Sequence, residues 1–337
     1  MISKEEFREK CKNVIPKEEL QKFEKDRKNK KTCKTILILI DVLLTILFAI
    51  FYTYFILLTI PFTILISILI VNAIFMNKWN DFKDKYGKDV ISILLEGIEH
   101  TYDPKGVIDR QIFNESRFFV DIYGNYNGDF VLNANKGLDF RTDYYDRYTG
   151  EDLLIIDIPK NDGTPSGVKL SVCDLNVTKE KTRRVTRRSA NGSTTTEIEN
   201  YTEVVYNKSF GFVEFPFQFK CNLSINHNDW DLNKIQVEDI NFNKQYNVYT
   251  DNHLEALIIL TPVMITKLME LSKRIKGFKL KITQTGKMYF GMSRNLFSLK
   301  VSDKLPLEFM FDRFYDDLTN LMLIITEIKD NDKIFKM

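Results

Sequence analysis

An apolar run of 43 residues occupies positions 35–77 and holds a single charged side chain, Asp41. One membrane-spanning helix needs about 20 apolar residues, so the run is long enough for two. Pro61 falls near the start of the second helix, where its missing N–H costs little. We therefore predict a transmembrane helical hairpin over residues 35–77, with its turn near residues 52–59.

Charges on both sides of this run predict its orientation. Lysines crowd both ends: Lys28, Lys30, Lys31 and Lys34 before it, and Lys78, Lys83, Lys85 and Lys88 after it. Because basic flanks favour the cytoplasmic side, a hairpin with both termini in the cytoplasm satisfies both ends, whereas a single span would not. Asp41 is alone and close to the basic end. We expect it to reach toward Lys34 or the lipid headgroups rather than to line an ion path.

Outside this run, three further segments can be distinguished. Residues 1–34 form a charged segment with helical spacing, in which Pro16 precedes a new helix. Residues 78–104 show apolar positions at helical spacing and predict a juxtamembrane helix that ends at Asp103-Pro104. His100 is then expected near the end of that helix. From residue 105 to residue 337 we predict a cytoplasmic domain.

That domain carries strand signals first and helix signals later. Short alternating or aromatic-rich runs occur at residues 116–124, 152–159, 167–177, 203–219 and 222–226. Asn252 and Thr261 are predicted N-caps of two consecutive helices, with Pro262 at the first position of the second. Thr285-Gly286 separates two apolar runs as a hairpin turn, and residues 312–329 have a helical apolar face. The fold class predicted is α+β, with antiparallel strands and packed helices.

A basic cluster lies between the strand signals, in a predicted hairpin arm over residues 176–205. Its candidate binding residues are Arg183, Arg184, Arg187 and Arg188. Such a patch near a bilayer can bind anionic lipid, and it can equally bind nucleic acid or an acidic partner. A solvated arm without a ligand is the structural alternative. The net charge of +2 gives no reason to expect nucleic acid.

The register of this arm can also be predicted. Asn191-Gly192 is the strongest two-residue hairpin signal, and a turn there makes the numbers of paired residues sum to 383. That register pairs Val185 with Ile198, Arg184 with Glu199, and Thr182 with Tyr201. One apolar pair and one pair of opposite charges would then face each other.

Catalytic, metal and cofactor motifs are missing from the sequence. The four cysteines are scattered without a CxxC pair, which indicates reduced thiols. The three histidines lack metal-ligand spacing, and no Walker loop, GxGxxG or GxSxG motif occurs. We therefore assign no catalytic residue, metal or cofactor. Any acid–base chemistry would fall to carboxylates with shifted pKa values, which a sequence cannot reveal.

Four stretches carry a resemblance to a known family: DRYTGEDLL at residues 146–154, KSFGFVEFPFQF at 208–219, YNVYTDNHLEALIILTP at 246–262 and GKMYFGM at 286–292. The chain resembles a bacterial family of uncharacterised membrane proteins, a domain of unknown function with two N-terminal transmembrane helices and a cytoplasmic α+β domain. The likeness covers most of residues 80–330. It implies the bacterial inner membrane as location, and a small membrane-anchored helical protein of the LemA type as partner. The family supplies no established catalytic or binding residues.

These observations lead to one expected function and two alternatives. We expect a membrane-anchored cytoplasmic binding or scaffolding module, since an anchor and a core pattern are present without a catalytic constellation. One alternative is a membrane-anchored enzyme that uses buried carboxylates or tyrosines. The other is a sensor of anionic membrane surfaces that works through the basic arm.

Overall fold

The computed structural model describes residues 2–51, 69, 71, 82–118, 145–160, 162–188, 194–227, 232–275, 277–297, 309 and 311–335. The chain divides into two compact units. The N-terminal unit comprises Met1–Gly97 with Ser298–Asp316, and the sheet unit comprises Ile98–Phe297 with Asp317–Met337. The sheet unit thus begins ahead of the predicted domain start at residue 105, because the first strand of the sheet lies before that position.

Helices make up the described part of the N-terminal unit. α1 spans Lys4–Val14, and α2 spans Lys17–Phe51, directly after Pro16 as predicted. Residues 82–94 form a further helix. The prediction that this helix continues to Asp103-Pro104 is wrong. Residues 100–103 form a strand instead, in which His100 pairs with Ile156, so sheet pairing overrides the helical spacing there.

Long-range contacts hold α1 to the first turn of α8, which spans Asp312–Lys329. The buried ring of Phe7 lies 5.5 Å from the ring of Tyr315, measured between centroids. Arg8 donates from Nε to Asp312 Oδ1 at 2.6 Å, and Lys4 Nζ lies 2.7 Å from Asp316 Oδ2. The N-terminal unit therefore contains two segments that are far apart in the sequence and pack against each other.

The predicted transmembrane hairpin is only partly covered by the described residues. Its first half continues α2 without a break from the charged segment. No helix within the described ranges combines the length and hydropathy expected of a membrane span. Residues 52–68, 70 and 72–81, which include the predicted turn and most of the second span, lie outside those ranges. The hairpin thus stays a prediction.

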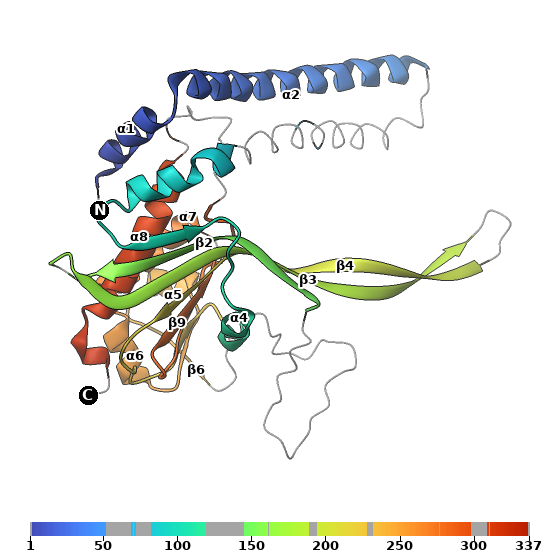
Figure 1. The fold of residues 1–337 in the computed structure, drawn as a ribbon. Helices are drawn as coiled ribbons and strands as arrows, with labels where there is room; N and C mark the ends of the chain where they lie inside the picture. The colour runs from blue at the N-terminus through green and yellow to red at the C-terminus, as the bar shows by residue number, and fades with distance from the viewer. Residues whose placement is uncertain are drawn as a thin grey trace. The chain divides into compact units, whose positions relative to one another are not determined.

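The sheet unit is α+β, built on a large antiparallel sheet (Figure 1). Its described strands are β1 His100–Asp103, β2 Arg147–Pro159, β3 Pro165–Arg188, β4 Thr194–Glu214, β5 Leu223–Ile225, β6 Asn233–Ile235, β7 Val248–Thr250, β8 Lys279–Ile282 and β9 Lys287–Gly291. Their order in the sheet is β1-β2-β3-β4-β9-β8-β5-β7-β6. The helices are α4 Arg110–Ser116, α5 Ile240–Gln245, α6 His253–Ile259, α7 Pro262–Arg274 and the remainder of α8, followed by the 3-10 helix η3 Asp332–Ile334. The predicted strand at residues 116–124 falls almost entirely outside the described ranges.

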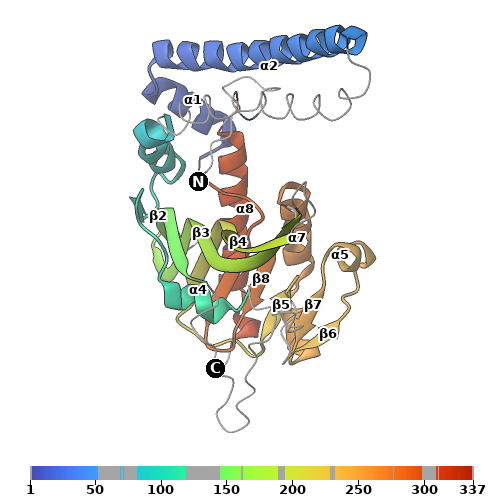
Figure 2. The same ribbon diagram turned by 90° about the vertical axis from the view of Figure 1, so that its right-hand side faces the viewer.

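Both faces of this sheet are buried near β3. Successive side chains of a strand point to opposite faces. Leu170 and Val172 lie on one face and Cys173 and Leu175 on the other, and all four are buried. The second pair packs in one cluster with Phe113 of α4. Figure 2 shows α4 in front of the sheet and α8 behind it, so the sheet is the middle layer of the unit.

Local caps and turns follow the sequence predictions closely. Asn252 caps α6 by accepting from Glu255 N at 3.4 Å, and Thr261 caps α7 by accepting from Met264 N at 3.1 Å. Pro262 occupies the start of α7, as predicted. Gly286 closes the β8–β9 turn at a φ of 85°, a backbone conformation that favours glycine. The predicted hairpin at Thr285-Gly286 is confirmed.

The β3–β4 hairpin has two registers separated by a β-bulge. In its root, residues 169–177 and 206–214, Val177 pairs with Tyr206. In its outer arm, residues 178–188 and 194–204, Thr178 pairs with Val204, so Val205 is the extra residue of β4. The sum of the two residue numbers in each pair therefore changes across the bulge. The sum of 383 that was predicted for the arm holds only in the root.

The predicted pairs of the outer arm are therefore wrong by one residue. Arg184 pairs with Ile198, and Arg183 takes the place opposite Glu199. A shift of one residue moves every side chain of one strand to the other face relative to its partner. Residues 189–193, where the predicted turn at Asn191-Gly192 falls, lie outside the described ranges.

Candidate functional site

The outer arm contains all four arginines predicted as binding residues. Beyond Thr178, β3 pairs with no described strand other than β4, and β9 pairs with β4 only within the root. Figure 1 shows this part of the hairpin leaving the sheet as a two-stranded ribbon. Because no third strand or helix of the described structure covers it, the arm offers two faces to its surroundings.

One of these faces carries cross-strand ion pairs, and we name it the ion-paired face. Glu199 accepts from Arg183 Nη2 at 2.9 Å and from Arg187 Nη2 at 2.7 Å. Lys181 pairs with Glu203 further along the same face. The hydrogen bonds from Arg183 and then Arg187 lower the pKa of Glu199 below its ordinary value. The basic side chains of this face are thus partly neutralised by the sister strand.

The opposite face combines charged and uncharged side chains, and we name it the Arg184 face. Arg184 is exposed and has no ion pair or hydrogen bond with any residue that the structure describes. Ile198 is directly opposite and is 70% exposed, and Val204 on the same face is 57% exposed. Other members are the hydroxyl side chains of Thr182, Thr186, Thr196 and Thr202, the amide of Asn200 and the carboxylate of Glu180, which lies 3.4 Å from Arg147 Nη2.

The structure therefore divides the predicted patch of four arginines. Arg183 and Arg187 meet on Glu199, and Arg184 lies on the other face. The register places Arg188 opposite Thr194, and the side chain of Arg188 lies outside what is described. The composition of the sequence located the arm, but only the bulge at Val205 decides which arginines are paired.

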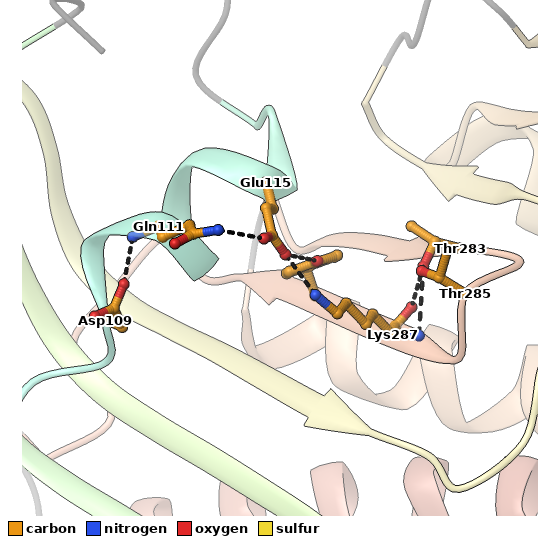
Figure 3. A network of polar contacts seen from close by, with 7 residues as sticks. Asp109, Gln111, Glu115, Thr283, Thr285 and Lys287 are labelled. Atoms are coloured by element: carbon orange, nitrogen blue, oxygen red, sulfur yellow. Dashed lines mark hydrogen bonds and ion pairs between the residues drawn. The ribbon is translucent and has the colours of Figure 1, made fainter.

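A second polar cluster joins α4 to β9 (Figure 3). Glu115 Oε2 accepts from Lys287 Nζ at 2.7 Å and from the hydroxyl of Tyr289 at 3.0 Å, and Gln111 reaches the other oxygen at 3.4 Å. Partial burial raises the pKa of Glu115, but the hydrogen bonds from Lys287 and Tyr289 outweigh it and the pKa lies below its ordinary value. The carboxylate is thus ionised and held by both partners, and it fastens α4 to the sheet.

Three buried carboxylates in the sheet unit also hold structural positions. Asp174 accepts from the hydroxyl of Ser209 and from the backbone N–H of Leu296 at 3.2 Å. Asp317 of α8 pairs with Arg294. The third, Asp152, accepts from the hydroxyl of Tyr102.

No group of three or more metal-ligating side chains occurs among the described residues. The three histidines come from separate elements: His100 from β1, His227 after β5 and His253 from α6. Burial raises the pKa of the Cys173 thiol to about 12, which keeps it protonated. The described histidine and cysteine side chains thus form no metal-ligating cluster, and the thiol of Cys173 serves the core.

A groove of about 1210 Å³ lies within the N-terminal unit. Charges of both signs line it, together with apolar residues: Glu5, Arg8, Lys12, Glu24, Ile15 and Phe311. Arg8 is already paired with Asp312. Because its charges are mixed, the groove favours no particular ligand chemistry.

Comparison with known families finds a match to part of the chain. A family model with the description "Protein of unknown function (DUF3137)" matches residues 193–329, from the tip of the outer arm to the end of α8. This match agrees with the domain of unknown function that the resemblance implied. No curated protein and no solved structure matches the chain.

Proposed function

We propose that the chain is a binding or scaffolding module held in the bacterial inner membrane by a helical hairpin over residues 35–77, with both termini in the cytoplasm. Support comes from the apolar half of α2. Several large apolar side chains there are exposed: Ile36, Ile38, Leu39, Ile40, Val42 and Leu43. Exposed apolar surface of this kind needs lipid or protein around it.

One observation carries the binding role. The outer arm presents Ile198 and Val204 as exposed apolar side chains beside Arg184, at a distance from the core. Isolated two-stranded ribbons are at best marginally stable in water, so an arm of this length gains stability from a partner. The Arg184 face is therefore the contact surface that we assign to the module.

The buried carboxylates favour this function over a carboxylate-based enzyme. Asp174 holds the backbone N–H of Leu296, and Asp317 holds α8 through Arg294. Glu115 is bound by Lys287 and Tyr289. An acid–base pair needs a carboxyl group that can reach a substrate. A small membrane-anchored helical protein, the partner implied by the resemblance, is compatible with a scaffolding role.

The experiment places a photo-crosslinking amino acid at position 198 or at position 197 of the full-length chain in its native membrane. Ile198 belongs to the Arg184 face, and Glu197 belongs to the ion-paired face. We expect adducts from position 198 and few from position 197. Equal or absent adducts at both positions would refute the assigned surface. Reporter fusions at the two termini check the anchor, and a periplasmic signal from either would contradict it.

A further inference from the structure

We propose that the free edge of β3 in the outer arm binds an extended acidic segment of another protein, which adds to the ribbon as a third, antiparallel strand. This inference rests on the binding role proposed above and names the chemistry of the partner. The edge borders the Arg184 face, so a partner that contacts this face can also reach the edge.

The direction of the backbone groups shows what this edge offers. At the base of the arm, the backbone oxygen of Thr178 accepts from the N–H of Asp146 at 3.0 Å, and the next even-numbered residue donates its N–H to the carboxylate of Asp146. Even-numbered residues of β3 therefore turn their backbone groups away from β4. Further out, these groups have no hydrogen-bond partner among the described residues at Thr182, Arg184 and Thr186. Such a row is a template for another strand.

Charge distinguishes the two edges of the arm. Residues 179–187 of β3 carry five basic side chains and one carboxylate, whereas residues 194–204 of β4 carry three carboxylates and no basic side chain. Opposite charges that face each other across two strands stabilise the pairing, and like charges destabilise it. The free edge of β3 thus deters a basic strand and favours an acidic one.

β4 shows what a strand complementary to β3 looks like. On the ion-paired face, Glu199 lies opposite Arg183, and Glu203 forms an ion pair with Lys181. All three carboxylates of β4 occupy odd-numbered positions, so they share this face. A strand on the other edge of β3 would meet the same basic side chains. We therefore expect the partner to place carboxylates at alternate positions, facing Lys181, Arg183 and Arg187.

A second copy of this chain is not the partner that we expect. Antiparallel pairing of β3 with β4 of a second copy would make both arms point the same way, about 10 Å apart at the usual spacing between strands. The described strands of the sheet unit form a nine-stranded sheet, which is about 40 Å wide at that spacing. Two such units would overlap, whereas an extended segment brings no sheet to the root of the arm.

The experiment measures peptide binding to the full-length chain in mild detergent by fluorescence anisotropy. The acidic probe is a labelled peptide with the sequence of residues 194–204. The neutral probe has glutamine in place of its three glutamates. We expect the acidic probe to bind, and the neutral probe to bind more than about fivefold more weakly, because three contacts between opposite charges are lost.

Two proline variants locate the bound strand. Thr182→Pro removes an outward N–H from the edge of β3. Asn200 lies directly opposite and turns its N–H to the edge of β4, so Asn200→Pro is the matched control. Both positions tolerate proline because neither N–H belongs to the β3–β4 ladder. We expect Thr182→Pro to weaken binding of the acidic probe by about fivefold or more, since a hydrogen bond of about 1 kcal/mol is lost. Asn200→Pro should leave the affinity unchanged.

The integrity of the arm is checked in both proline variants. A Thr186→Cys/Thr196→Cys pair, in a Cys33→Ser background because Cys33 is exposed and the other cysteines are buried, should oxidise rapidly in each. If either proline disrupts the arm, a second matched pair decides. Arg187→Gln should then weaken binding of the acidic probe by up to about fivefold, and Glu197→Gln should not weaken it.

Binding that is lost in Thr182→Pro and kept in Asn200→Pro supports the inference. Absent binding of the acidic probe, equal binding of the neutral probe, or equal losses in the two proline variants overturn it. Phosphatidylglycerol vesicles or single-stranded DNA that displace the probe, and still bind fully to Thr182→Pro, also overturn it, because the basic side chains then act without the edge.

The outcome can be separated from that of the proposed function. Adducts at position 198 without binding of the acidic probe refute this inference alone. Binding of the probe without adducts at position 198 refutes the surface assigned to the proposed function, and leaves the edge of β3 as the contact. Adducts between two copies have twice the mass of the chain, and with exclusion of the probe they would overturn this inference in favour of self-association.

Discussion

The root and the outer arm of the β3–β4 hairpin are parts of the same two strands, yet their surroundings differ completely. In the root, Phe210 is fully buried and its ring lies 5.2 Å from that of Phe113, measured between centroids. In the arm, Ile198 is 70% exposed, and ion pairs replace the core contacts. One bulged residue, Val205, separates the two.

This difference shows which interactions go with the strand register in each part of the hairpin. The register of the root is set by its buried side chains, since a slip would turn them to solvent. The register of the arm sets which charges meet across the strands, and it differs by one residue. Packing thus determines the root, and the bulge decides that Arg183 and Arg187, rather than Arg184, share Glu199.

Removing a root side chain is expected to have the largest effect. Phe210→Ala should lower the free energy of unfolding by about 3 to 5 kcal/mol, because a large buried ring is lost and a cavity remains. Ile198→Ala, its counterpart in the arm, should change it by less than about 0.5 kcal/mol. Denaturant unfolding of the full chain in mild detergent, followed by circular dichroism, measures both. Similar losses in the two variants would contradict the division into root and arm.

The second-largest loss of stability is expected from removing the buried hydrogen bonds of Asp174 in the root. Asp174→Ala should cost about 3 kcal/mol, since the buried N–H of Leu296 and the hydroxyl of Ser209 both lose their carboxylate acceptor. Glu197→Ala, an exposed carboxylate of the arm, serves as the control and should leave the unfolding midpoint unchanged. A loss below about 1 kcal/mol for Asp174→Ala would mean that this network does not hold the segment after β9.

The Glu115 cluster predicts a pH dependence. Its folded-state pKa lies below the ordinary value of 4.5, so ionised Glu115 stabilises the fold above that pH and the contribution is lost as the pH falls through the folded pKa. Because this pair is partly exposed, we expect about 0.5 to 1 kcal/mol. Glu115→Gln should flatten the acid limb of a stability–pH curve, and Lys287→Met should move that limb to higher pH. An unchanged limb in both would contradict the assigned role.

The smallest change in stability is expected from Glu199→Gln. Its ion pairs are exposed, and such pairs contribute little to folding. The same change releases Arg183 and Arg187, and should therefore increase binding of the acidic probe to the arm while the unfolding curve stays the same. Loss of stability without a change in binding would show that the ion-paired face has a structural role instead.

Much of the local structure could be predicted from the sequence. Asn252 and Thr261 act as caps through their own side chains, and Gly286 closes a turn that glycine favours, so short-range chemistry was sufficient. The contact of Arg8 with Asp312 joins segments 304 positions apart, and no local pattern reports it. His100 was placed in a helix because the spacing before it is helical, but pairing with β2 decides its structure.

The sequence located the outer arm, but it did not show which arginines of the arm pair with Glu199. Charge density alone identified the arm that holds Arg183, Arg184 and Arg187. The bulge at Val205 arises where the register of the buried root meets the register near the tip, and neither register is visible in composition. The prediction took the register of the arm from a two-residue turn at Asn191-Gly192, and it therefore assigned the wrong arginine to Glu199.

The most direct test of the central claim is a cross-strand disulfide in the outer arm, in the Cys33→Ser background. Direct partners in an antiparallel ladder lie within the Cα separation that a disulfide requires, and side chains on opposite faces cannot be joined. The observed register predicts rapid oxidation of the Thr186→Cys/Thr196→Cys pair and slow oxidation of Thr186→Cys/Glu197→Cys. The reverse result would mean that the arm keeps the register of the root, and that Arg184 is the arginine paired with Glu199.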